Sequence, residues 1–442
     1  MSGGPFELVK EKAGFREFRL RSNGLRVLLL QNRVAPVATF CIVYHVGSRN
    51  EAVGHTGATH LLEHLMFKGT PEFQRDKGTA IAAVLEALGA RFNATTWFDR
   101  TNYYETLPSD ALATAARIEA SRMRQALLRD SDRAPEMSVV RNEFERGENS
   151  PFQVLYKHTF ATAFREHPYH HPTIGWRSDI EEVTTERLRE FYDTFYYPNN
   201  ATAMVIGDFD EAEVLALLAK EYHAIEPSSR PIPPVYTVEP PQEGERRFVV
   251  RRVGEVAWCG LSWRTPEARH PDTPALAVLG NVLGGGVTSR LHQALVESSL
   301  ALSVTVVPWQ LKDPALFSVF APVRPGVEPA EVEKVIRQQI AKVAADAVTD
   351  AECAKAKTQI EAEVIFDRDS TDQIAASLSE AIAVADWEWY ADYPAAIARV
   401  TPEDVRRVVL AYLHDDALTV GVYLPKPAAQ AKTPGPARED AA

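Results

Sequence analysis

The chain has few cysteines: Cys41, Cys259 and Cys353 are the three among its 442 residues. They are far apart and form no C-x-x-C pair, so neither a disulfide framework nor a structural zinc knuckle is expected. No apolar run approaches the roughly 20 residues that span a bilayer, which excludes a membrane-spanning helix. Residues 1–7 contain neither a basic segment nor an apolar segment, so we expect no secretory signal and a cytoplasmic protein.

Positive charge is also in the minority. The chain has 48 lysines and arginines but 60 aspartates and glutamates, and the resulting net charge of -12 argues against nucleic-acid binding. No G-x-S-x-G motif is present for a serine nucleophile. The glycines at 284–286 lack the Lys-Ser/Thr pair that follows in a phosphate-binding loop. Serine-hydrolase and nucleotide-binding functions are therefore excluded.

Residues 60–64, His-Leu-Leu-Glu-His, are the most informative segment that is present. On a helix, positions i and i+4 lie one above the other, so His60 and His64 can bind one metal ion. Glu63 points to the same side, where it serves as a base and not as a ligand. H-x-x-E-H is the inverted form of a zinc-protease motif. Thr56 is the expected N-cap of this helix.

A second helix is predicted at residues 134–146, where a proline lies early in the first turn and apolar residues follow at helical spacing. A catalytic zinc uses three protein ligands and keeps a position for water, so the first helix needs one more ligand. Glu136 and Glu143 share a face of the second helix. Without other signals, two glutamates on one face of a helix usually point into solvent. Beside H-x-x-E-H, Glu143 is the best candidate for the third ligand, and Glu136 is expected to orient a ligand histidine or to hold the neighbouring helix.

Further segments occur in a characteristic order and spacing around these residues. They are residues 47–51, 57–70 and 93–96, then Glu136 with Glu143, then residues 198–202. With them, most of the chain resembles the inverzincin peptidases of the pitrilysin and insulinase type, in particular the half-length branch that includes the mitochondrial processing peptidase. The resemblance implies that His60, His64 and Glu143 bind one zinc ion per chain. It also implies that Glu63 is the general base and Glu136 a supporting catalytic acid.

The chain divides near its middle. Residues 226–247 are rich in proline and indicate a linker between an N-terminal zinc-bearing domain, 1–225, and a C-terminal domain, 248–424. The two halves resemble copies offset by 217 residues, since 183–189 align with 400–406 and 201–206 with 418–423. Under the same offset, the positions that correspond to His60, Glu63 and His64 are Ala277, Gly280 and Asn281. These three residues cannot form this site.

Strand and helix patterns predict the fold class. In the first half, strands at 26–31 and 39–46 precede a long helix, further strands and further helices. This order indicates an α+β protein of two homologous halves, each a mostly antiparallel sheet with helices packed on one face. The resemblance implies the same fold twice per chain. The tail, 425–442, is rich in Pro, Ala and Lys and is predicted to be disordered.

Substrate binding is predicted at residues 92–106, whose β-branched and aromatic residues indicate strands. An unpaired strand edge binds an extended peptide through backbone hydrogen bonds, and the resemblance implies that Asn93 and Ala94 do so. Without the resemblance, a buried or capped strand is the simpler interpretation. Arg290 matches an arginine that, in the family, holds the substrate with a tyrosine about a dozen residues later. Leu302 stands at the tyrosine position and cannot donate that hydrogen bond.

Three histidines, His167, His170 and His171, lie close together in the sequence. A second metal site is one interpretation of such a group. Prolines interrupt any helical face there, so a solvated loop is the favoured prediction.

The residues together predict a zinc-dependent endopeptidase that hydrolyses peptides or unfolded segments. The alternative is a non-catalytic scaffold subunit, like the respiratory-complex core proteins of this fold, in which zinc motifs are typically eroded. Full-length relatives enclose peptides between two halves of about this chain's size, so we expect a dimer. Because of Leu302, the favoured partner is a paralogous subunit that lacks the zinc motif but carries the arginine-tyrosine pair, and a homodimer is the alternative.

Overall fold

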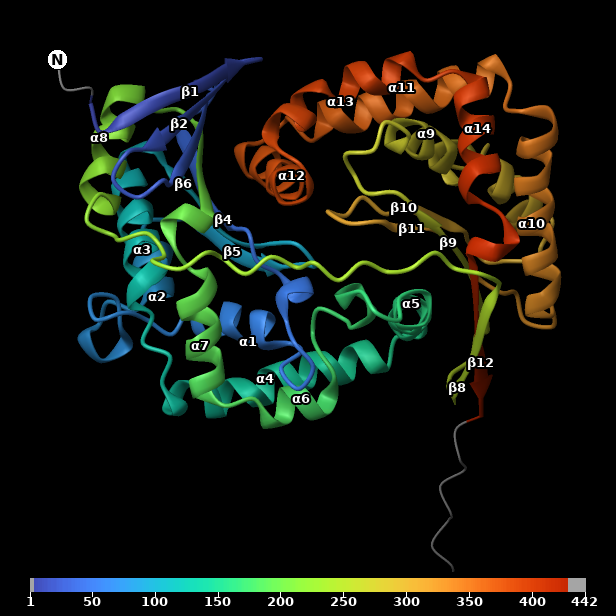
Figure 1. The fold of residues 1–442 in the computed structure, drawn as a ribbon, viewed down its shortest axis with the longest axis horizontal. Helices are drawn as coiled ribbons and strands as arrows, with labels where there is room; N and C mark the ends of the chain where they lie inside the picture. Colours follow the sequence, from blue (N-terminus) through green and yellow to red (C-terminus); the bar gives the residue numbers. More distant parts are fainter. Residues whose placement is uncertain (1–3, 428–442) are drawn as a thin grey trace, which may run out of the picture.

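Two mixed β-sheets organise the chain, and the computed structural model describes residues 4–427 (Figure 1). The first sheet has the strand order β1-β2-β3-β7-β4-β6-β5. In this sheet β3 and β7 run parallel, and the other neighbouring strands are antiparallel. Its strands are β1 (Phe6–Lys12), β2 (Phe15–Leu20), β3 (Arg26–Gln31), β4 (Val37–Tyr44), β5 (Arg91–Thr96), β6 (Thr101–Pro108) and β7 (Ala201–Gly207).

The second sheet repeats the arrangement of the first. Its strand order is β10-β11-β9-β12-β8. Followed from β8 to β10, this order corresponds to β3-β7-β4-β6-β5 of the first sheet. Strands β8 and β12 form the parallel pair. This agreement confirms the predicted α+β class with two homologous halves, each mostly antiparallel. Its strands are β8 (Arg246–Val253), β9 (Trp258–Thr265), β10 (Thr305–Pro308), β11 (Ala315–Pro322) and β12 (Leu418–Lys426).

The helices follow the same duplication. Helix α7 (Thr185–Phe195) and helix α14 (Pro402–Tyr412) begin 217 residues apart, as do β7 and β12. Helix α1 (Ala58–Leu65) corresponds to part of α9 (Thr273–Gly284). The remaining α-helices are α2 (Ile81–Ala87), α3 (Leu112–Gln125), α4 (Asp130–Glu148), α5 (Pro151–Ala163), α6 (Arg177–Glu182), α8 (Glu211–Tyr222), α10 (Pro329–Asp346), α11 (Asp350–Phe366), α12 (Thr371–Val384) and α13 (Trp387–Arg399).

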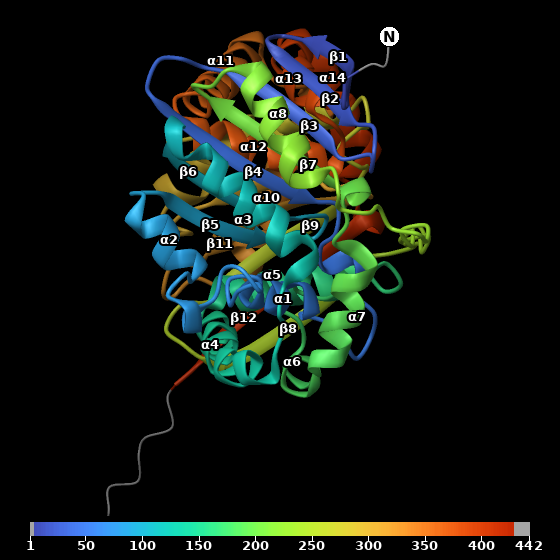
Figure 2. The same ribbon diagram turned by 90° about the vertical axis from the view of Figure 1, so that its left-hand side faces the viewer.

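Each half packs its own helices on one face of its sheet, as predicted, but the opposite face is covered by a helix from the other half. Helix α12 contacts β4, β6 and β7 of the first sheet, and α5 contacts β8, β9 and β12 of the second. At the first of these contacts, Leu28, Val43 and Met204 pack against Ile374 and Leu378. Figure 2 looks through the first half toward the orange and red helices of the second half behind it. The exchange buries apolar sheet faces that either half alone would expose.

No helix or strand is assigned between Tyr222 and Arg246, where the linker was predicted. Within this stretch Glu239 is buried, and its carboxylate accepts hydrogen bonds from the backbone N–H groups of residues 165–167. Strand β12 includes Pro425 and Lys426, so the start of the predicted disordered tail was wrong because these residues pair with β8. The rest of that prediction, residues 428–442, lies outside the described residues. Across residues 4–427, we find no helix with the length and apolar content needed to cross a bilayer.

Candidate metal centre

Helix α1 carries the H-x-x-E-H motif, and the acid that caps its N-terminus is Glu51. Its two carboxylate oxygens accept hydrogen bonds from the backbone N–H groups of Gly57 and Thr59, each at 2.8 Å. The predicted cap, Thr56, was wrong, because its hydroxyl donates to Asp179 and the N-cap position is Gly57 with φ of +86°. Glu51 lies in the segment 47–51 quoted above. The sequence did not identify it as the cap, because an acid from a preceding loop stands at no fixed spacing from the helix that it caps.

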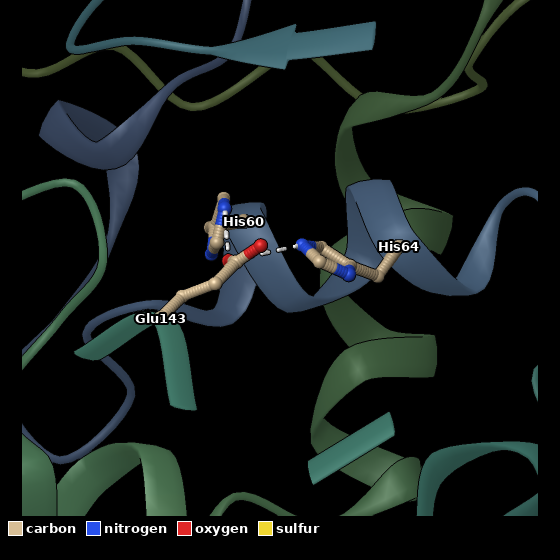
Figure 3. Close-up of side chains that lie close together, drawn as sticks. All are labelled: His60, His64 and Glu143. Carbon is tan, nitrogen blue, oxygen red and sulfur yellow. Dashed lines mark ion pairs between the residues drawn. The ribbon is translucent and has the colours of Figure 1, made fainter. Parts of the chain in front are cut away.

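The structure brings the three predicted metal ligands together (Figure 3). His60 and His64 extend from α1, and Glu143 approaches from α4. Both Nε2 atoms lie 3.6 Å from the same oxygen, Glu143 Oε2, and one ligand atom from each residue lies within 4.8 Å of the others. The distance of 3.6 Å between nitrogen and oxygen is too long for a hydrogen bond. It matches the roughly 3.4 Å that separates two ligand atoms bound tetrahedrally to zinc at about 2.1 Å. The residues therefore fit a catalytic zinc site of two histidines and one glutamate.

The protonation state of His60 also suits metal binding. Burial, with a smaller contribution from the neighbouring His64, lowers the pKa of His60 to about 3, so His60 is neutral at neutral pH. A neutral imidazole is the form that binds a metal ion.

Glu136 contacts the ring nitrogen of His64 that does not face Glu143. The His64 Nδ1–H donates to Glu136 Oε1 at 2.8 Å, which leaves Nε2 directed at Glu143. The other Glu136 oxygen pairs with Lys68. Burial acts to raise the pKa of Glu136, but the hydrogen bonds from Lys68 and His64 outweigh it and lower the pKa. Glu136 is thus an anion that contacts a ligand histidine, one of the two arrangements expected from its spacing.

Glu63 lies on the same helix and points toward β5. Its Oε2 accepts a hydrogen bond of 2.5 Å from the Thr96 hydroxyl at the end of that strand. Burial raises the pKa of Glu63, and the Thr96 hydrogen bond opposes the rise. A carboxylate with a raised pKa is a better general base near neutral pH than an ordinary glutamate. Thr96 was not singled out from the sequence, although it ends the 93–96 segment.

The predicted peptide-binding strand, β5, is an edge strand, paired with β6 on one side and with no strand of the described residues on the other. The strand is therefore not paired on both edges, which was one form of the alternative. Asn93 is exposed, whereas Ala94 is only 5% exposed.

Arg290 does not lie free in a cleft. Its Nε and Nη2 donate to the two oxygens of Glu352 at 2.7 and 2.8 Å, and Nη2 also donates to the Ala347 carbonyl. Within residues 4–427, no hydrogen bond or ion pair joins Arg290 to His60, His64 or Glu143. Leu302, at the expected tyrosine position, is 47% exposed.

The histidine group is not a solvated loop, and that prediction was wrong. His167 and His171 are buried. His167 Nδ1 accepts from the Tyr169 backbone, so its Nε2–H donates to Asp313 at 3.0 Å. His171 Nδ1 lies 3.7 Å from Glu51. Pro168 begins a short 3-10 helix, Pro168–His170, whose Tyr169 packs with Leu311 and Leu316 of the second half. Residues 4–427 contain no group with metal-ligand spacing besides His60, His64 and Glu143, so the second metal site is not supported either.

A pocket of about 450 Å³ opens beside Glu143. Its walls are mainly apolar, and Lys157 in its lining pairs with Glu148. Trp97 directly follows β5, so a peptide paired with that strand would pass this pocket. The apolar and aromatic lining residues are Trp97, Phe144, Tyr156, Pro172 and Ile174.

Comparison with known proteins places this geometry in a family. A profile described as insulinase, peptidase family M16, matches residues 26–176, and one described as peptidase M16 inactive domain matches residues 182–360. The zinc protease PqqE of Helicobacter pylori is 32% identical over 403 residues, which cover 90% of each chain. The chain belongs to peptidase family M16. The predicted family is thereby confirmed.

Two further comparisons agree. A crystal structure of a protease from Helicobacter pylori matches this chain with a TM-score of 0.89 and 30% identity, covering 93% of this chain and 99% of the other. A probable mitochondrial-processing peptidase subunit beta from Arabidopsis thaliana is 26% identical and covers 91% of this chain and 77% of its own length. The profile named as inactive falls on the M16 half in which Ala277, Gly280 and Asn281 replace the motif.

Proposed function

We propose that this chain is a zinc-dependent endopeptidase that hydrolyses peptides or unfolded segments. The observation that carries the proposal is the convergence of His60, His64 and Glu143 within 4.8 Å, with Glu63 on the same turn of helix. A zinc ion held there supplies Lewis acidity, which lowers the pKa of a water to about 7 and polarises the scissile carbonyl. The names of the relatives as zinc proteases support this metal.

The protein's own residues then manage the protons and the substrate. Glu63, held by Thr96, takes a proton from the attacking water and delivers it to the leaving amine. The substrate adds to the free edge of β5 through backbone hydrogen bonds, at Asn93 and Ala94. One of its side chains enters the apolar pocket beside Glu143. Backbone pairing tolerates many sequences, so unfolded segments are better substrates than folded domains.

A digest of a peptide library by the purified chain tests this proposal. We expect fragments in the untreated sample and none after the metal is removed by a chelator, because the chelated chain keeps the fold but loses the Lewis acid. The competing function, a non-catalytic scaffold, is favoured by the profile named as inactive on residues 182–360. It predicts intact peptides in both samples.

Glu136 has a separate expected effect. Glu136→Gln removes the anion behind His64 and the partner of Lys68, so metal affinity should fall about 10–100-fold while the fold is kept. Competition with a calibrated chelator measures the affinity. Glu145→Gln on the same helix is the matched control, since Glu145 is exposed and contacts no ligand residue of the described site. Equal affinities in the two variants would remove Glu136 from the centre.

We further propose a dimer with a paralogous subunit that lacks the zinc motif. The relationship to a protein named as subunit beta supports an assembly, and Leu302 and the Arg290–Glu352 ion pair leave this chain without a free arginine-tyrosine pair. We expect weak cleavage by the isolated chain and a marked gain on adding the product of an adjacent paralogous gene. Strong activity of the isolated chain, unchanged by that product, would favour the homodimer and make Leu302 harmless.

A further inference from the structure

The second half, which holds no predicted metal ligand, places an acidic side chain against Arg49 of the first half, two residues before the Glu51 that caps α1. Asp313 lies between β10 and β11, and its Oδ2 accepts from Arg49 at 2.9 and 2.7 Å and from His167 at 3.0 Å. Arg49 is only 8% exposed, and its other acidic neighbour, Asp99, is 3.5 Å away. The Tyr169 hydroxyl donates to Asp99 and accepts from the Asp313 backbone, which closes the network.

Arg49 connects this network to the zinc helix. The backbone N–H groups of Ser48 and Arg49 donate to the carbonyls of Trp97 and Phe98, in the turn between β5 and β6, at 3.0 and 2.9 Å. Two residues after Arg49, Glu51 caps the first turn of α1. The segment that Arg49 anchors therefore sets the position of α1 relative to β5.

A second acid from the same half acts on the other side of that turn. Glu380, on α12, accepts from Arg100 Nε at 3.0 Å. Arg100 is 7% exposed, and its Nη1 donates to the Thr95 carbonyl at 2.7 Å and to the Thr95 hydroxyl at 2.5 Å. The next residue, Thr96, donates to Glu63. Both arginines thus border the β5–β6 turn, and both take a carboxylate from the opposite half.

We propose that Asp313 and Glu380 are positioning residues through which the metal-free half fixes the geometry of the zinc site and of the base Glu63. Without either carboxylate, a buried guanidinium loses a charged hydrogen-bond partner and shifts to find water. The turn and the segment 47–51 shift with it. A displacement of about 1 Å at a catalytic group can cost about 100-fold in rate. The inference about the metal stands on its own, and the part about Glu63 rests on the proposed peptidase function.

The test compares Asp313→Asn, Glu380→Gln and the double variant with Glu388→Gln, all in the full chain. Glu388 also bridges the halves, through Lys10 on β1, but this exposed pair reaches no element of the site and is expected to contribute little. Cobalt(II) replaces zinc, because its visible absorption band reports ligand geometry. For the double variant we expect a shifted band, about tenfold weaker cobalt binding and a kcat about 100-fold lower with an unchanged KM. Glu388→Gln should match the wild type.

Two readings of the result separate the hypotheses. If the single and double variants give the wild-type band, cobalt affinity and kcat, the proposal is overturned. If the wild type binds cobalt but cleaves no peptide, the peptidase function fails, while the bands and affinities still decide whether Asp313 and Glu380 set the metal geometry. Should the double variant fail to fold, as a thermal melt will show, the single variants carry the same comparison.

Discussion

Glu63→Gln is expected to keep its zinc and to lose turnover by about 10²–10⁴-fold, the contribution of a general base. Glutamine has the same shape and still accepts the Thr96 hydrogen bond through its amide oxygen, so the helix and the ligands stay in place. Its amide cannot take a proton from water at neutral pH. Steady-state kcat with a model peptide and metal content per chain, measured on the same preparation, check both parts of this expectation.

The matched control for this variant is again Glu145→Gln, an exposed change on a neighbouring helix that should leave kcat near the wild-type value. Wild-type turnover in Glu63→Gln would show that another group accepts the proton. Loss of zinc together with turnover would mean that Glu63 is a ligand or a structural support, and the assignment as a base would fall.

His64→Ala is expected to abolish both zinc binding and peptide cleavage. It removes one of three ligands and also one of the two partners of the partly buried Glu136 carboxylate, which keeps its ion pair with Lys68. His60→Ala should behave alike. The readout independent of activity is the melting temperature: zinc should raise it in the wild type, by mass action on the folded state, and leave it unchanged in either variant.

A surface histidine provides the comparison. His223→Ala, at the end of α8, should keep the zinc-dependent rise in melting temperature because His223 is exposed and far in sequence from the motif. Retention of one zinc per chain and of activity in His64→Ala would mean that the metal binds elsewhere.

Local patterns identified the residues that converge at the candidate metal centre, because most of the spacing that unites them lies within single helices. His60, Glu63 and His64 share one helix, and Glu136 and Glu143 share another, so helical periodicity alone put each set on one face. The two halves were visible because the repeated elements keep a constant offset, as α7 and α14 do. The need for a third ligand suggested that the two helices meet at Glu143, and the family resemblance implied the same ligand set.

Features that depend on the other half could not be predicted in this way. His167 reads as a residue of a polar loop until Asp313, 146 positions away, is placed beside it. An apolar helix face does not reveal which sheet it will cover, so the exchange of α5 and α12 had no sequence signal. The resemblance implied that Arg290 holds the substrate, whereas Glu352, 62 positions away, accepts hydrogen bonds from its guanidinium. The partner of a charged side chain depends on which residues the fold brings close to it, and amino-acid composition does not identify those residues.

The most direct test of the central claim is a zinc titration of activity. The purified chain, with its partner subunit if one is required, is stripped of metal and zinc is then added in measured steps while peptide cleavage is followed. We expect no cleavage at zero zinc, a linear rise, and a plateau at about one zinc per chain that carries the H-x-x-E-H motif. Full cleavage by the stripped protein, or none at any zinc level, would contradict the account.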